Sequence, residues 1–93
     1  MQIQQDEHGR KGAFFIDEDG EWIAELTYFK DNGTMTIDHT EIAEKLRGEG
    51  VGQDMVRAAV DYARRNGLKV EPTCPYARKI IESTPELQDV LQS

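Results

Sequence analysis

The stretch "LRGEGVG", residues 46–52, places glycines at positions 48, 50 and 52, directly after an arginine and ahead of a helix-forming run. Glycine loses more conformational freedom on folding than any other residue, so such a repeat is favoured only where side chains cannot be accommodated. The first backbone N–H groups of a helix lack intrahelical partners, and the helix dipole favours an anion there. The stretch therefore predicts a phosphate-binding turn at a helix start.

The spacing around this turn argues against the commonest nucleotide motifs. A P-loop requires Lys and then Ser or Thr after its last glycine, whereas Gln53 and Asp54 follow here. A dinucleotide-binding turn requires G-x-G-x-x-G, and the sequence has G-x-G-x-G, although Glu71 lies about 20 residues downstream. The short chain and the strands predicted before the turn also disfavour a Rossmann domain.

Segments upstream of the turn have the character of strands. "AFFID" (13–17) and "EWIAELTYF" (21–29) are separated by "DEDG", and "DNG" (31–33) separates the second from "TMTIDHTEI" (34–42). Both separators contain residues that tolerate left-handed turn geometry. We therefore predict an antiparallel meander, in which Trp22, Tyr28 and Phe29 pack in the core or on a sheet face.

Downstream of Gly52 the hydrophobic period becomes helical, with Val56, Ala59, Val60 and Ala63 on one face and Gly67 as the closing residue. "LKVEP" (68–72) then predicts a strand, so residues 34–72 form a βαβ unit. Two short helices follow, in "PYARKIIES" and "STPELQDVLQS", where Thr84 can cap and Pro85 can begin the second. The prediction is one α+β domain over residues 1–93.

Composition and charge narrow the possible partners. The chain is 38% hydrophobic and 31% charged, without a signal-like or membrane-length apolar run, so we expect a cytoplasmic globular protein. Residues 1–44 carry 11 acids and three bases, whereas residues 45–93 carry seven acids and eight bases. The acidic half disfavours nucleic acid and membrane surfaces and favours cations. His8, His39 and Cys74 lack the close pairing of a zinc site, so no metal is expected.

The sequence "RGEGVG", between a predicted strand and a long helix, resembles the pyrophosphate-binding turn of the GNAT superfamily of N-acetyltransferases. That motif is Arg or Gln, two residues, Gly, one residue, and Gly or Ala, which Arg47, Gly50 and Gly52 match. Residues 39–81, including Cys-Pro-Tyr at 74–76, resemble a small subfamily of GNAT-like proteins. The resemblance implies a minimal GNAT-like fold and acetyl transfer from acetyl-CoA to an unidentified, cationic amine, either a small molecule or a protein lysine.

The same resemblance assigns expected roles to particular residues. It implies that the pantetheine arm pairs with the backbone of Ile42. The cofactor-binding residues it implies are Ile42, Arg47, Gly48, Glu49, Gly50, Val51 and Gly52.

Three residues are candidates for the chemistry. Cys74 is either a nucleophile that accepts the acetyl group or a small buried side chain. His39 is either a base or a core histidine, because strand alternation places it on the face of Met35 and Ile37. Tyr76 resembles the tyrosine that protonates the departing CoA thiolate in many GNAT enzymes, and helix packing is its alternative. We favour direct attack by the amine over a covalent acetyl-cysteine.

Two other functions fit the sequence. A CoA-binding module would keep the glycine turn without turnover, and an acidic protein-interaction domain would use the turn only structurally. The oligomeric state stays open.

Overall fold

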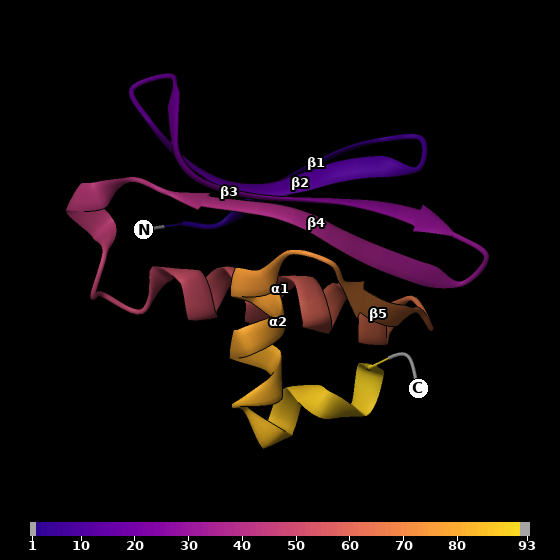
Figure 1. The fold of residues 1–93 in the computed structure, drawn as a ribbon. Helices are drawn as coiled ribbons and strands as arrows, with labels where there is room; N and C mark the ends of the chain where they lie inside the picture. Colours follow the sequence, from indigo (N-terminus) through magenta and orange to yellow (C-terminus); the bar gives the residue numbers. More distant parts are fainter. Residues whose placement is uncertain (1, 92–93) are drawn as a thin grey trace.

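The computed structural model describes residues 2–91, in which one five-stranded sheet carries both α-helices on the same face (Figure 1). The strands lie side by side in chain order, and β5 is parallel to β4 while the other pairs are antiparallel. The strands are β1 (Gln4–His8), β2 (Lys11–Glu18), β3 (Glu21–Asp31), β4 (Thr34–Ile42) and β5 (Lys69–Pro72). The helices are α1 (Val51–Arg65), α2 (Pro75–Glu82) and the 3₁₀ helices η1 (Glu44–Leu46) and η2 (Pro85–Val90). The predicted α+β fold, with its meander, βαβ unit and closing helices, is confirmed.

Two hairpin turns follow from their residue types. Asn32 and Gly33, between β3 and β4, have φ of 51° and 79°, and Asp19 and Gly20, between β2 and β3, have φ of 54° and 85°. Consecutive left-handed residues match the right-handed twist of the flanking strands, so they select tight hairpins. The Gly20 N–H also donates to the Asp17 carboxylate at 2.8 Å. These turns fix the order of β2, β3 and β4.

Strand β1 has no counterpart among the predicted strands, because all five of its residues are classed as exposed and they lack apolar alternation. Contacts from other elements hold it in place. The Tyr28 hydroxyl of β3 donates to Glu7 Oε1 at 2.6 Å, and the Tyr62 hydroxyl of α1 donates to the same oxygen at 2.7 Å. Lys30 Nζ lies 3.0 Å from Glu7 Oε2. This group, the Glu7 network, connects the edge strand to α1.

The core lies between the sheet and α1. Leu26, Met35 and Ile37 are fully buried on the inner face of the sheet, opposite the predicted apolar face of α1. Full burial of such side chains contributes about 1.5–3 kcal/mol each, which holds α1, and with it the glycine turn, against β4. None of the helices in residues 2–91 is long and apolar enough to cross a membrane.

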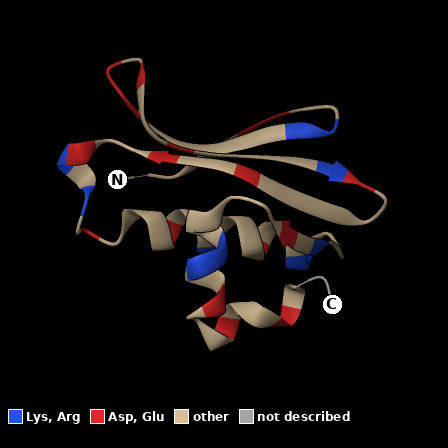
Figure 2. Ribbon diagram, in the orientation of Figure 1, with Lys and Arg blue, Asp and Glu red and all other residues tan. Residues whose placement is uncertain are grey.

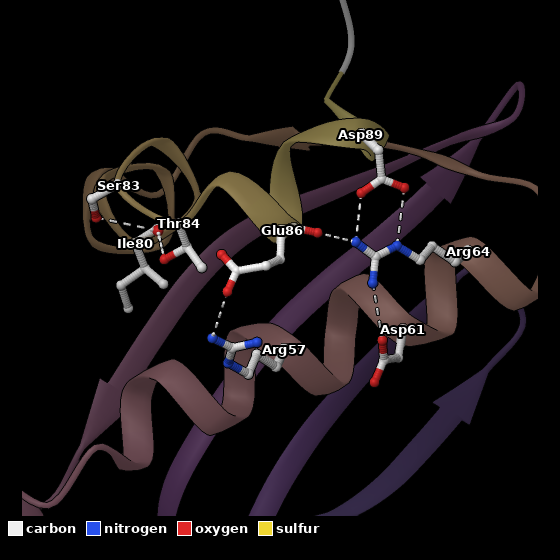
Figure 3. Close-up of polar contacts among 8 residues, drawn as sticks. All are labelled: Arg57, Asp61, Arg64, Ile80, Ser83, Thr84, Glu86 and Asp89. Carbon is white, nitrogen blue, oxygen red and sulfur yellow. Dashed lines mark hydrogen bonds and ion pairs between the residues drawn. The ribbon is translucent and has the colours of Figure 1, made fainter.

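The C-terminal segment buries Leu87 and Val90 in the core. Ion pairs also join this segment to α1 (Figure 3). Arg64 Nε donates to Asp89 at 3.0 Å, and Arg57 lies 3.9 Å from Glu86. Pro85 begins η2 as predicted. Thr84 occupies the capping position, but its hydroxyl donates to the Ile80 carbonyl at 2.7 Å, so the prediction of a side-chain cap is wrong.

Candidate functional site

The turn before α1 owes two of its glycines to backbone geometry. Gly48 and Gly50 have φ of 83° and 76°, and a Cβ at either position would meet no atom within 4 Å. An L-residue with a side chain is strained in this region, so the dihedral angle alone explains both glycines. Gly50 is the N-cap of α1, so the helix begins at Val51, two residues before the start after Gly52 that the sequence indicated, and no side chain caps the helix.

The absence of a cap leaves donors at the start of α1. The Asp54 N–H donates to the Gly50 carbonyl at 3.1 Å, so the N–H groups of Val51, Gly52 and Gln53 precede the helical hydrogen bonds. The side chain of Arg47 has no ion-pair partner among the described residues. Free amide donors beside an unpaired guanidinium form a site suited to phosphate oxygens.

A cavity of about 770 Å³ adjoins this turn. Its walls come from the end of β4, the turn, the first residues of α1 and two residues of α2. They are Thr40, Glu41, Ile42, Leu46, Arg47, Gly48, Gly50, Val51, Gly52, Gln53, Tyr76 and Ile80. This volume lies within the range of small-molecule sites. The fold thus gathers segments more than 30 residues apart around one hollow.

The β4 wall is formed where two parallel strands separate. β4 pairs with β5 only from Thr34 to Ile37. The Ile37 carbonyl then accepts from the N–H groups of Thr73 and Cys74, at 3.0 and 3.1 Å. Within residues 2–91, no later residue of β4 pairs with β5. Backbone groups of β4 beyond Ile37 are therefore open toward the cavity side, next to Thr40 and Ile42.

A β-bulge in β4 corrects the predicted position of His39. Thr27 pairs with His39 while Tyr28 pairs with Ile37, so Asp38 is an additional residue in the strand. The bulge reverses the alternation beyond it. The side chain of His39 is 55% exposed, with Nε2 at 3.5 Å from Glu41 Oε1, so the predicted face shared with Met35 and Ile37 is wrong.

Cys74 is buried and lies beside a different residue of β4. Its Sγ donates to Thr40 Oγ1 at 3.6 Å. Successive strand residues point to opposite faces, so a thiol in contact with Thr40 is on the other face from His39. The structure therefore does not bring together the cysteine and histidine that the sequence paired as nucleophile and base.

Most residues predicted for cofactor binding line the cavity, and their binding role stays a prediction. Ile42, Arg47, Gly48, Gly50, Val51 and Gly52 are among its walls, whereas exposed Glu49 is not. Tyr76 also lines it and is 47% exposed. The sequence reasoning missed Thr40 and Ile80. Spacing along the chain could have identified both. Thr40 lies two residues before Ile42 on the same face of a strand, and Ile80 lies four residues after Tyr76 on the same face of a helix.

Acidic residues outnumber basic ones in the meander (Figure 2). Lys45 and Arg47 add positive charge before α1. Lys45 is paired with Glu18, and this hydrogen bond raises the pKa of Lys45. Glu25 of β3 lies directly opposite Glu41 of β4, and Glu25 has no ion-pair partner among the described residues. Like charges in this register repel each other, so the position favours a cation.

Comparison with known proteins identifies the family. The family model described as GCN5-related N-acetyl-transferase matches residues 13–90. The structure of a GCN5-like protein from Staphylococcus aureus is 37% identical, with a TM-score of 0.78, over 99% of this chain and 88% of that one. The ribosomal-protein-alanine N-acetyltransferase of Brucella melitensis shares the fold, with 18% identity and a TM-score of 0.67, over 80% of this chain and 62% of that one.

Curated relatives are more distant. Protein NATD1 of Xenopus tropicalis is 33% identical over 52 residues, which are 56% of this chain and 48% of that protein. The matched region therefore spans about half the length of each. Protein NATD1 of Danio rerio is 24% identical over 95% of this chain and 80% of its own length. Because the family model covers most of the sequence, from β2 to the end of η2, the chain belongs to the GCN5-related N-acetyl-transferase family.

Proposed function

We propose that this protein binds acetyl-CoA in the cavity at the start of α1 and transfers the acetyl group to a cationic amine. The observation that carries the proposal is the turn itself. Left-handed Gly48 and Gly50 present uncapped amide donors beside unpaired Arg47, inside an open cavity. This donor set fits the pyrophosphate of the cofactor.

The separation of β4 from β5 supports the same ligand. A pantetheine arm contains amide groups, which can pair with a strand in the way a peptide does. The backbone of β4 near Ile42 is open on the cavity side for such pairing. We infer that the arm runs from the glycine turn toward Thr40, which brings the thioester near Tyr76.

Thermal unfolding with acetyl-CoA tests the binding step. At 100 times its dissociation constant a ligand stabilises a protein by about 2.7 kcal/mol, or roughly 10 °C or more for a domain of this size. Gly50→Val should abolish this gain. Gly20→Val is the matched control, because Gly20 has a φ of 85° and equally open surroundings but lies outside the cavity walls. No stabilisation of the wild type at millimolar acetyl-CoA would refute the proposal.

The acceptor is inferred from charge. Glu41 belongs to the cavity wall and faces Glu25 across the strand pair, so an ammonium group would relieve their repulsion. One solved neighbour with 15% identity is an aminoglycoside acetyltransferase in complex with sisomicin. Thioester cleavage over a panel of amines tests the acceptor class. Preference for neutral amines would contradict it, and binding without cleavage would indicate a CoA-binding module.

The position of Cys74 favours direct transfer. In direct transfer the acceptor ammonium first loses one proton to become a neutral amine. Its nitrogen then bonds to the acetyl carbon as the carbon–sulfur bond breaks, the nitrogen loses a second proton, and the leaving thiolate gains one proton. The thiol of Cys74 is buried against Thr40 and is not part of the cavity wall. We expect Cys74→Ala to retain most activity. Acetylated Cys74 after incubation with acetyl-CoA, together with an inactive Cys74→Ala variant, would show the covalent route instead.

A further inference from the structure

Gly52 requires a different explanation from the other two glycines of the turn. Gly48 and Gly50 have positive φ, but Gly52 does not and lies inside the first turn of α1. At a regular helical position alanine is more favourable than glycine. Backbone geometry therefore gives no reason for a glycine at position 52.

The reason lies in α2. A Cβ built on Gly52 would lie 2.6 Å from Cζ and 2.8 Å from Cε2 of Tyr76, and nearer still to the phenol oxygen. These separations are shorter than van der Waals contact permits. The ring of Tyr76 thus occupies the space that any side chain at position 52 would need.

No hydrogen bond from the described residues fixes the phenol of Tyr76. The hydroxyls of Tyr28 and Tyr62 both donate to Glu7, whereas the hydroxyl of Tyr76 has no hydrogen-bond partner within residues 2–91. The ring is 47% exposed, so solvent is open to it. The ring lies where a side chain of Gly52 would be, on the first turn of α1, and both residues line the cavity.

We propose that Gly52 is a positioning residue for Tyr76: the absent side chain holds the ring on the first turn of α1 and directs the unpartnered hydroxyl into the cavity. The inference rests on the proposed acetyl transfer, and it takes this hydroxyl as the source of the proton that the leaving thiolate gains, which is the role that the sequence resemblance implies for Tyr76. It differs from the expectation that all three glycines let the protein backbone come close to the pyrophosphate of the cofactor. An alanine at position 52 would move the ring into solvent and leave the amide donors in place.

A double-mutant cycle tests the proposal with wild type, Gly52→Ala, Tyr76→Ala and the double variant, and Tyr76→Phe keeps the ring without its hydroxyl. CoA dissociation constants come from calorimetry, and kcat and Tm are measured for each. We expect Gly52→Ala and Tyr76→Phe to lower kcat by about tenfold or more, with CoA affinity within about threefold. The double variant should be no slower than Tyr76→Ala, because the two changes remove one effect.

The Tm values give a readout that does not depend on turnover. Without the ring, alanine should favour the helix, so Gly52→Ala should raise Tm in the Tyr76→Ala background and not in the wild type. Tenfold weaker CoA binding from Gly52→Ala in both backgrounds would overturn the inference, and so would an equal rise in Tm in both. A wild type that binds no CoA would refute the proposed function, and the Tm comparison would still decide the Gly52–Tyr76 contact.

Discussion

Tyr28→Phe should destabilise the protein, because it removes one buried hydroxyl group and the hydrogen bonds that this group makes. Tyr28 is 2% exposed, and its hydroxyl donates to Glu7 Oε1 at 2.6 Å and accepts from Gln5 Nε2 at 2.7 Å. A hydrogen bond to a charged group contributes about 1.5–3 kcal/mol. Glu7 is 28% exposed and keeps its bonds from Tyr62 and Lys30, so the lower part of that range applies.

The expected loss is therefore about 2 kcal/mol in the free energy of unfolding, which corresponds to roughly 10 °C in Tm for a chain of this length. Urea denaturation followed by circular dichroism measures it at pH 7. Tyr76→Phe is the matched control, because that hydroxyl has no partner among the described residues. We expect the control to change stability by less than about 0.5 kcal/mol.

The pH dependence gives this prediction a second test. The hydrogen bond from Tyr28 is the largest cause of the lowered pKa of Glu7, and burial together with Glu7 raises the pKa of Tyr28. A carboxyl whose pKa is lower in the folded state stabilises the protein above its unfolded pKa, and this contribution disappears as the pH falls through the folded value. The difference between wild type and Tyr28→Phe should therefore shrink below the ordinary Glu pKa of about 4.3. A loss under 0.5 kcal/mol at pH 7, or one of equal size in acid, would refute the reasoning.

Three further predictions concern the turn, the C-terminal segment and the acceptor. Gly48→Ala should lower stability by about 1–2 kcal/mol, because its φ of 83° strains alanine; a neutral result in urea would contradict this. Asp89→Asn should lower Tm at low salt and neutral pH, because Arg64 lowers the pKa of Asp89 by hydrogen bonding, and the difference should shrink in acid and in 1 M salt. The specificity constant for a cationic amine should fall above about 0.1 M salt and in Glu25→Gln, but not in Asp19→Asn, which removes a turn charge.

The sequence alone determined the features that depend on local backbone geometry. Asn32 and Gly33, and the glycines at 48 and 50, adopt the left-handed conformations that their residue types favour. These preferences belong to single residues and their neighbours. The two inner hairpins, the turn and the start of the long helix were therefore predictable to within about a residue or two.

Tertiary structure decided the rest, because the relevant partners are distant along the chain. Strand β1 is exposed throughout and depends on Glu7 contacts from β3 and α1. The bulge at Asp38 arises in the pairing of β3 with β4, and it turns His39 outward and Thr40 toward Cys74. Gly52 is part of the glycine pattern in the sequence. The reason that it lacks a side chain, however, is the ring of Tyr76, which lies 24 residues later in the chain. Residue types specify which backbone angles are accessible, whereas the packing of separate elements specifies which side chains meet.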